Sequence, residues 1–215
     1  MITELRRYSV SPGSLDRMHT RMSRVLLPLF QDHGIPPPLA IWETSGDDPA
    51  VVTWLLRWPT LEQRNASWTA FRPVWEAAKR ARAEQEFVTR TDLTLIEPWP
   101  EHALAFASAE LACESAWVVQ PAVGHGAGFR AACMDRFFPT LRAYGALGIV
   151  ACEFVFGPLP QALILVSWPR PEIRSVGLDQ MRSGVNHEAE HIVAGSWSVL
   201  DRASYLTTWS LTAPH

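Results

Sequence analysis

The chain has 215 residues, enough for one large domain or two small ones with a substantial core. Its content of 47% hydrophobic and 19% charged residues is typical of globular proteins. The net charge of −3 argues against a nucleic-acid partner, which would require a basic face, and no apolar stretch approaches a membrane span. We therefore expect a cytoplasmic protein with no nucleic-acid or membrane partner.

Two residue types narrow the class further. The three cysteines are scattered and lack metal-ligand spacing, which favours buried thiols over disulfides. Eighteen of the nineteen basic residues are arginine, as is typical of a GC-rich genome such as an actinomycete's.

The first half of the chain predicts four strands and two helices in the order β-α-β-β-α-β. Strands are predicted at 2–10, 39–43, 51–58 and 93–97, and helices at 15–33 and 61–87, the second broken near Pro73. A turn at 11–13 and Ser14 as N-cap precede the first helix, and Gly34 ends it. This order is that of the ferredoxin-like split unit.

The second half repeats the same order. Strands are predicted at 113–120, 149–156, 162–168 and 205–212, and helices at 129–144 and 171–194. The predicted domains are 1–100 and 112–215, joined by a connector at 101–111.

Shared turn and helix signals link the two halves. Pro28 and Gly34 return as Pro139 and Gly145, each pair 111 positions apart, and Trp58 returns as Trp168 at an offset of 110. A repeat of about a hundred residues is the size of a small domain. The predicted fold is therefore α+β, with two tandem ferredoxin-like domains packed sheet to sheet.

The first repeat also carries a family resemblance. The run Glu4-Leu5-Arg6-Arg7-Tyr8 before Pro12-Gly13, the helix with Leu-Leu-Pro-Leu-Phe that ends at Gly34, and the strand that closes on Trp58 resemble the NIPSNAP family. That family belongs to the dimeric α/β-barrel superfamily, so the resemblance implies an intramolecular barrel built from the two domains. The superfamily includes cofactor-free monooxygenases, isomerases and cyclases of secondary metabolism, and members without known activity, so the site must decide the function.

A metal-binding motif occurs near the C-terminus. His187-Glu188-Ala189-Glu190-His191 matches H-E-x-x-H, which binds zinc when both histidines lie on one helical face. The extended motif requires glycine and histidine where the chain has Ala194 and Trp197. We therefore predict no metal and assign His187 to a pocket wall, with zinc on His187 and His191 as the alternative.

Three residues are candidates for catalysis. His19 lies on the helix stripe that should face the sheet, and it either completes a core hydrogen bond or lines a cavity as a general base. Glu4, Arg6 and Tyr8 share one face of the first strand by its period of two. Arg6 and Tyr8 are then either structural or donors to a substrate oxygen in the barrel lumen.

The tryptophans suggest a ligand pocket. Trp42, Trp54 and Trp58 fall on the middle strands and Trp75 on the covering helix, so they either fill the core or line an aromatic pocket. We add Arg130, the counterpart of His19, and His187 to this set of substrate-binding candidates.

The combined prediction is a small-molecule enzyme acting on an apolar aromatic or polyketide-like substrate without an organic cofactor. Oxygenation by a cofactor-free monooxygenase and proton relay by a cyclase or isomerase both remain open, as does a homodimer. The alternative is a non-catalytic ligand-binding or scaffold protein. Arg6 and Tyr8 correspond to Trp117 and Val119 in the second repeat, which predicts one asymmetric site instead of two equal ones.

Overall fold

A computed structural model describes residues 1–44, 50–83, 85–102, 113–156, 161–185 and 192–202. Within this part the chain forms two compact units, residues 1–95 (unit 1) and 96–202 (unit 2). Both contain helices and antiparallel strands, so the α+β class is confirmed. None of the helices in the described ranges is long and apolar enough to cross a membrane.

Unit 1 is built on four strands. They are β1 (Ile2–Val10), β2 (Pro38–Thr44), β3 (Val51–Trp58) and β4 (Val88–Pro98), of which residues 88–95 belong to this unit. β3 lies between β1 and β2 and is antiparallel to both. β4 lies along the other edge of β1, where the Thr89 hydroxyl donates to the Ser9 carbonyl at 3.2 Å. The predictions for β1 and β3 are confirmed to the residue, whereas β4 begins five residues earlier than predicted.

The first helical segment of unit 1 contains a π-helical turn. It runs through α1 (Leu15–Arg21), the π turn η1 (Met22–Leu26) and α2 (Leu27–Asp32). The ring of Pro28 would clash with the carbonyl of Arg24 in a regular α-helix, and the wider turn relieves this clash. Gly34 ends the segment with a φ of +68°, as predicted.

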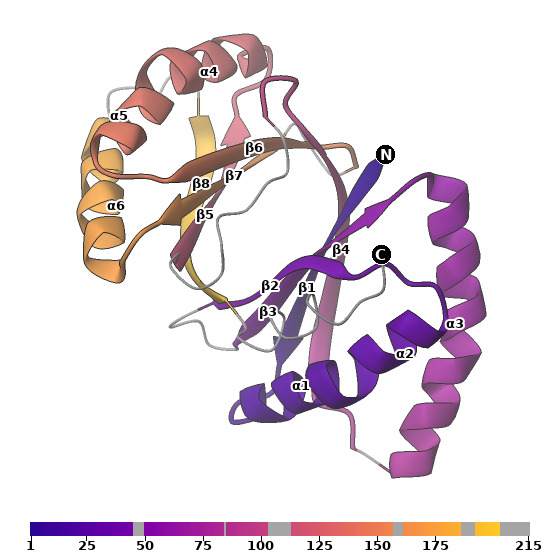
Figure 1. The fold of residues 1–215 in the computed structure, drawn as a ribbon. Coiled ribbons are helices and arrows are strands. Elements are labelled where there is room, and N and C mark those ends of the chain that lie inside the picture. Colours follow the sequence, from indigo (N-terminus) through magenta and orange to yellow (C-terminus); the bar gives the residue numbers. More distant parts are fainter. Residues whose placement is uncertain (45–49, 84, 103–112, 157–160, 186–191, 203–215) are drawn as a thin grey trace. The chain divides into compact units, whose positions relative to one another are not determined.

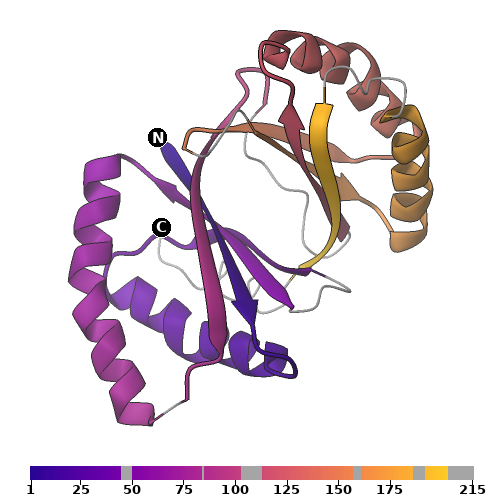
Figure 2. The ribbon, with the colours of Figure 1, turned by 180° about the vertical axis from the view of Figure 1, so that it is seen from behind.

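The second helix of unit 1, α3 (Leu61–Arg82), is continuous, so the predicted break at Pro73 is wrong. Proline removes one backbone hydrogen bond, at a cost of about 3 kcal/mol. Phe71 beside it is buried, and the partly buried Trp68 and Trp75 of the same helix also pack against the core cluster, so the packing of α3 offsets this cost. The helix ends at Ala83, which adopts a left-handed φ of 47°, and therefore stops before the predicted end at 87. Figures 1 and 2 show α3 and α1–α2 on the same side of the unit 1 strands.

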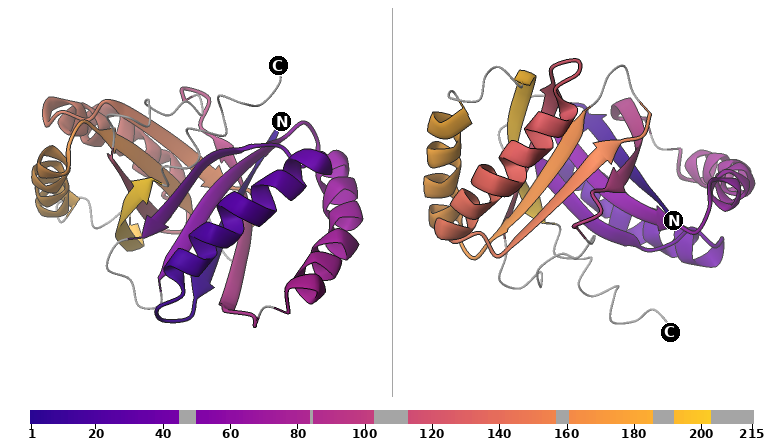
Figure 3. Two further views of the ribbon diagram at one scale, coloured as in Figure 1. Left: turned by 60° about the horizontal axis from the view of Figure 1, so that its bottom comes forward. Right: turned by 90° about the horizontal axis from the view of Figure 1, so that it is seen from above.

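Unit 2 has the same order of elements. Its strands are β5 (Cys113–Pro121), β6 (Gly148–Phe154), β7 (Ala162–Trp168) and β8 (Ile192–Arg202). Its helices are α4 (Gly126–Ala132), the π turn η2 (Cys133–Phe137), α5 (Phe138–Ala143) and α6 (Pro171–Val185). β7 lies between β5 and β6, and β8 pairs with the other edge of β5. The helices cover one side of these strands (Figure 3).

The end of unit 2 corrects one prediction. The helix predicted to reach 194 is shorter, because α6 ends at Val185 and β8 (Ile192–Arg202) already begins at Ile192, with Trp197 paired to Trp117 of β5. The strand predicted at 205–212 lies outside the described residues and stays a prediction. The run from Ile192 onward contains strand-forming residues such as Ile192 and Val193, which favour a strand over continuation of the helix.

Local irregularities recur in the two units at the same offset. The π turns begin at Met22 and Cys133, 111 residues apart, and each precedes the proline at 28 or 139. Gly145 ends the helical segment of unit 2 with a φ of +93°, as Gly34 does in unit 1. The two units therefore share their π turns and their helix-terminating glycines as well as the order of their elements.

Candidate functional site

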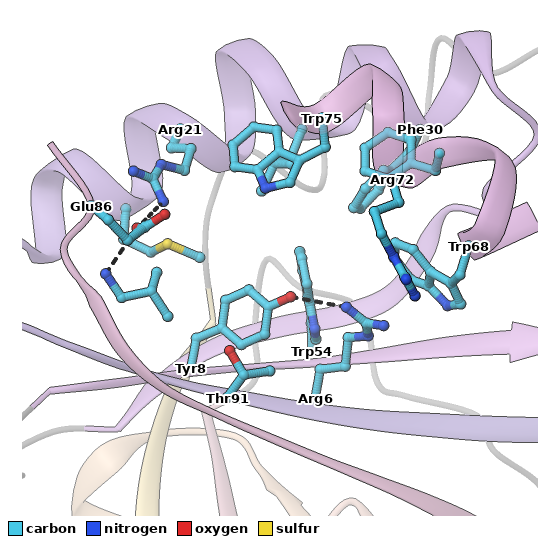
Figure 4. Close-up of a pocket in the computed structure, with 14 residues that line it drawn as sticks. Arg6, Tyr8, Arg21, Phe30, Trp54, Trp68, Arg72, Trp75, Glu86 and Thr91 are labelled. Carbon is cyan, nitrogen blue, oxygen red and sulfur yellow. Dashed lines mark hydrogen bonds and ion pairs between the residues drawn. The ribbon is translucent and has the colours of Figure 1, made fainter. Parts of the chain in front are cut away.

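Unit 1 encloses a cavity of about 270 Å³ between its strands and its helices (Figure 4). Six aromatic side chains line it: Tyr8, Phe30, Trp54, Trp68, Phe71 and Trp75. Four charged side chains also line it: Arg6, Arg21, Arg72 and Glu86. Polar and apolar surface contribute about equally to the wall, so the cavity offers both aromatic contacts and polar groups to a small molecule.

A buried carboxylate supports the cavity from behind. Glu4 has no exposed surface and accepts hydrogen bonds from Arg6 Nε at 2.6 Å and from Arg64 Nε and Nη2 at 2.9 Å each. The indoles of Trp58 and Trp68 donate to its Oε2 at 2.9 and 3.0 Å. Burial alone would raise the pKa of Glu4, but the bonds from Arg64, the charge of Arg6 and the remaining donors outweigh it. The pKa therefore lies below its usual 4.5, and Glu4 is a carboxylate at neutral pH.

Arg6 and Tyr8 form the polar part of the cavity floor. Arg6 Nη1 donates to the Tyr8 hydroxyl at 2.9 Å, and its guanidinium lies 3.8 Å from the centre of the Trp68 ring. Burial raises the pKa of Tyr8, although the charge of Arg6 opposes that shift. Tyr8 therefore keeps its proton at neutral pH, and its O–H can donate to a ligand oxygen.

A second polar pair at the cavity was not predicted. Arg21 on α1 is nearly buried, and its Nη1 donates to Glu86 Oε1 at 2.7 Å. Glu86 also accepts from the backbone N–H groups of Phe87 and Val88 at 2.9 and 3.0 Å. Burial raises the pKa of Glu86, but the Val88 bond, the Arg21 bond and the Phe87 bond together lower it below 4.5. The one available signal in the sequence was an arginine three residues after Met18, within the apolar stripe of the helix.

Of the two predictions for Arg6 and Tyr8, the structural one agrees with the contact of Arg6 with Glu4, and the one that placed both residues in the barrel lumen is wrong. Glu4, Arg6 and Tyr8 do share one face, but it is the face covered by the helices of unit 1, because Arg6 pairs with Trp54 and both contact the helix-side cavity. Strand periodicity groups the residues of a face without indicating what covers it.

The four predicted tryptophans divide between different positions. Trp54 and Trp75 line the cavity, and Trp58 lies behind it as a donor to Glu4. Trp42 lies on the opposite face of the sheet, because its neighbour Ile41 is the residue that pairs with Trp54. Two of the four therefore lie where a ligand in this cavity would contact them.

His19 and Arg130 lie outside the cavity lining. His19 Nε2 is 2.7 Å from Glu43 Oε2 on β2. Arg130 donates to Glu101 at 2.5 Å, and its Nη1 lies 3.7 Å from Glu153, the counterpart of Glu43 in unit 2. The two residues thus make equivalent helix-to-strand contacts in their units.

The histidines of the H-E-x-x-H motif, His187 and His191, lie outside the described residues. The described part of the chain contains no group of three His, Cys, Asp or Glu side chains that could hold a metal ion. Zinc at this motif and the pocket role of His187 therefore stay predictions.

The fold and the cavity define an α+β protein with an aromatic-lined cavity in its first unit. Residues 3–101 match the model of the NIPSNAP family, which confirms the resemblance drawn from the sequence. No curated protein matches the chain.

Solved structures with the same fold include three proteins that differ in name. One from Fusobacterium nucleatum, named "Putative monooxygenase", superposes with a TM-score of 0.63 at 6% identity, over 94% of this chain and 91% of that one. An anthrone oxidase-like protein gives 0.63 at 10% identity, with coverage of 94% and 91%. A third, named "Putative Chlorite dismutase", gives 0.58 at 11%, with coverage of 99% and 100%. At these identities the likeness establishes the fold and not the reaction.

Proposed function

We propose that this chain is an enzyme that acts on an apolar aromatic or polyketide-like small molecule in the cavity of unit 1, without an organic cofactor. The observation that supports this most directly is the pairing of an aromatic wall with the Arg6–Tyr8 hydrogen bond at the cavity floor. The wall suits a flat ring system, and the polar pair suits an oxygen on that ring.

Arg6 and Tyr8 would stabilise negative charge on a substrate oxygen. The Tyr8 O–H donates to the oxygen, and the guanidinium of Arg6 lies directly behind the phenol. Glu4 fixes Arg6 in this position through its bond to Nε. A hydroxyl donor that is already fixed in position stabilises an enolate or phenolate oxygen more than the oxygen of the neutral substrate.

The reaction we favour is oxygenation of such an anion by O₂. A ring CH₂ that lies across the ring from a carbonyl, as in anthrone, becomes C=O: one atom of O₂ enters the product, and the other leaves as water together with the two hydrogens of the CH₂. The names of the monooxygenase and the anthrone oxidase-like neighbour support this version. A cyclase or isomerase would use the same oxyanion stabilisation without O₂.

Anthrone under air provides the test. We expect the protein to form anthraquinone and consume O₂ faster than buffer does, and Tyr8→Phe to lower kcat by about 10²-fold, because it removes a donor to the oxyanion. Tyr144→Phe is the matched control, since Tyr144 is partly exposed in unit 2. Wild-type turnover unaffected by Tyr8→Phe would contradict the proposed role of the floor.

A binding protein without chemistry is the second candidate, and one observation favours it. Within the described residues, the cavity lining contains no histidine, and its one carboxylate, Glu86, already pairs with Arg21. Anthrone that binds without turnover would support this candidate over the enzyme.

We also propose that the two units are diverged copies of one ferredoxin-like domain. Their shared element order and the π turns at equivalent positions support this relation. A homodimer and a cytoplasmic location stay predictions.

A further inference from the structure

We propose that the ligand of the unit 1 cavity is an aromatic anion, with a carboxylate or phenolate group that is bound by arginine. This inference rests on the proposed function, because it specifies the ligand of the same cavity. It follows from the balance of charge around the cavity.

The buried side of the cavity has more cations than anions. Arg6 and Arg64 share the single carboxylate of Glu4, and their side chains are only 12% and 14% exposed. One positive charge in this cluster therefore has no counter-charge within it. A cation held away from water attracts an anion more strongly than an exposed one does.

The second ion pair does not supply the missing anion. Glu86 is bonded to Arg21 and to two backbone N–H groups, and the pair is neutral as a whole. The lining as a whole is therefore cationic.

Arg72 adds a further charge where a ligand can reach it. It lies on α3, lines the cavity and is exposed to solvent, and within the described residues it forms no ion pair or hydrogen bond (Figure 4). A guanidinium with all its donors available can bind a carboxylate through two parallel hydrogen bonds. Arg72 is thus the group best placed to bind the ligand's charge.

The aromatic side chains of the cavity indicate the shape of the uncharged part of the ligand. Phe30, Trp54, Phe71 and Trp75 present aromatic surface to the cavity, which favours a flat ring system over an aliphatic chain. A cavity of about 270 Å³ accommodates a ligand of two or three fused rings.

Two probes of nearly equal shape test the charge alone: 2-naphthoate and its neutral amide, 2-naphthamide. Isothermal titration calorimetry near neutral pH and at low salt should give an affinity for naphthoate at least about tenfold higher than for naphthamide. Arg72→Gln should weaken naphthoate binding about fivefold and leave naphthamide within about twofold. Arg80→Gln, on the exposed part of α3, is the matched control and should change neither affinity.

Two further measurements locate the site and remain informative if Arg72→Gln is unstable. Thr91→Trp places a large ring at the exposed rim of the cavity and should abolish binding of both probes. Raising the ionic strength from about 0.02 M to about 0.3 M should weaken naphthoate binding to the wild type and leave naphthamide unchanged.

The outcomes separate the two proposals. If both probes bind the wild type equally well, the anion inference is wrong while the aromatic cavity stands. If neither probe binds, the proposed function fails together with the inference.

Discussion

Replacing Glu4 by glutamine should destabilise unit 1 strongly, because this carboxylate is the shared acceptor of two arginines and two indoles. Glutamine keeps the shape of the side chain but removes its charge. Its amide nitrogen would also face donors, since both carboxylate oxygens accept hydrogen bonds from Arg6, Arg64 or a tryptophan.

The size of the effect follows from what remains after the substitution. Two guanidinium groups, each less than 15% exposed, would lie close together without their carboxylate. Removal of one partner from a buried ion pair typically costs about 3–5 kcal/mol, because the other charge stays buried. We place Glu4→Gln at about 3 kcal/mol, since the glutamine oxygen still accepts hydrogen bonds.

Urea unfolding near neutral pH, followed by tryptophan fluorescence, measures this loss. Glu76→Gln is the control, since Glu76 pairs with Lys79 at the surface and is 47% exposed, and such pairs contribute about 0.5 kcal/mol or less. A loss below about 1 kcal/mol for Glu4→Gln would refute the argument that Glu4 neutralises this cluster.

The stabilisation that Glu4 provides should depend on pH, and Glu4→Gln tests this dependence. The pKa of Glu4 lies below 4.5 in the folded chain, so the unfolded chain takes up the proton first as the pH falls. The stabilisation by Glu4 is complete above about pH 4.5 and is lost as the pH falls through the folded pKa. The difference in unfolding free energy between wild type and Glu4→Gln should therefore narrow on acidification. A difference independent of pH would contradict the lowered pKa.

Two further predictions concern unit 2. Gly177→Ala should lower the free energy of unfolding by about 1–3 kcal/mol, because the new Cβ would lie 2.2 Å from the fully buried ring of Trp168. Gly126→Ala is the control; this position has open space around it, so the substitution should be neutral or slightly stabilising. Burial raises the pKa of Cys152 to about 12, so iodoacetamide at mildly alkaline pH should modify this thiol only after the protein unfolds. Mass spectrometry measures the modification, and rapid modification of the native protein would show that the thiol is accessible.

Elements with strong local signals were predictable from the sequence. The strands at Ile2–Val10, Val51–Trp58 and Ala162–Trp168 match their predictions to the residue, because runs of strand-forming residues are bounded by turns. Pro73 misled the prediction because its local preference is outweighed by the packing of α3, which no local pattern reveals.

The candidate site was predictable only in part. Periodicity placed Glu4, Arg6 and Tyr8 on one face, but the helices that cover that face are a property of the whole unit. The ion pair of Arg21 and Glu86 joins residues 65 positions apart, so it depends on tertiary structure alone. For His19 the sequence left open a hydrogen bond or a place in the cavity; the side chain makes the hydrogen bond, to Glu43 on strand β2, and lies outside the cavity lining.

The residues that line the cavity of unit 1 differ from those at the corresponding positions of unit 2. In unit 2 the positions of Arg6, Tyr8 and Met18 are occupied by Trp117, Val119 and Phe129, all of them buried in its apolar core cluster. At these positions unit 2 therefore has buried apolar side chains where unit 1 has the Arg6–Tyr8 pair.

The supporting carboxylate changes together with the cavity. Trp168 keeps the indole hydrogen bond of its counterpart Trp58, but the acceptor is the hydroxyl of Ser115 at 3.0 Å in place of Glu4. A neutral acceptor satisfies one indole, whereas a buried carboxylate requires cations around it. In unit 1 the carboxylate of Glu4 binds Arg6 and Arg64 as well as the two indoles, and in doing so it holds Arg6 at the cavity floor. The corresponding positions of unit 2, Ser115 and Trp117, carry neither the carboxylate nor the guanidinium, so this charged cluster is a feature of unit 1 that the shared packing of the two units does not require.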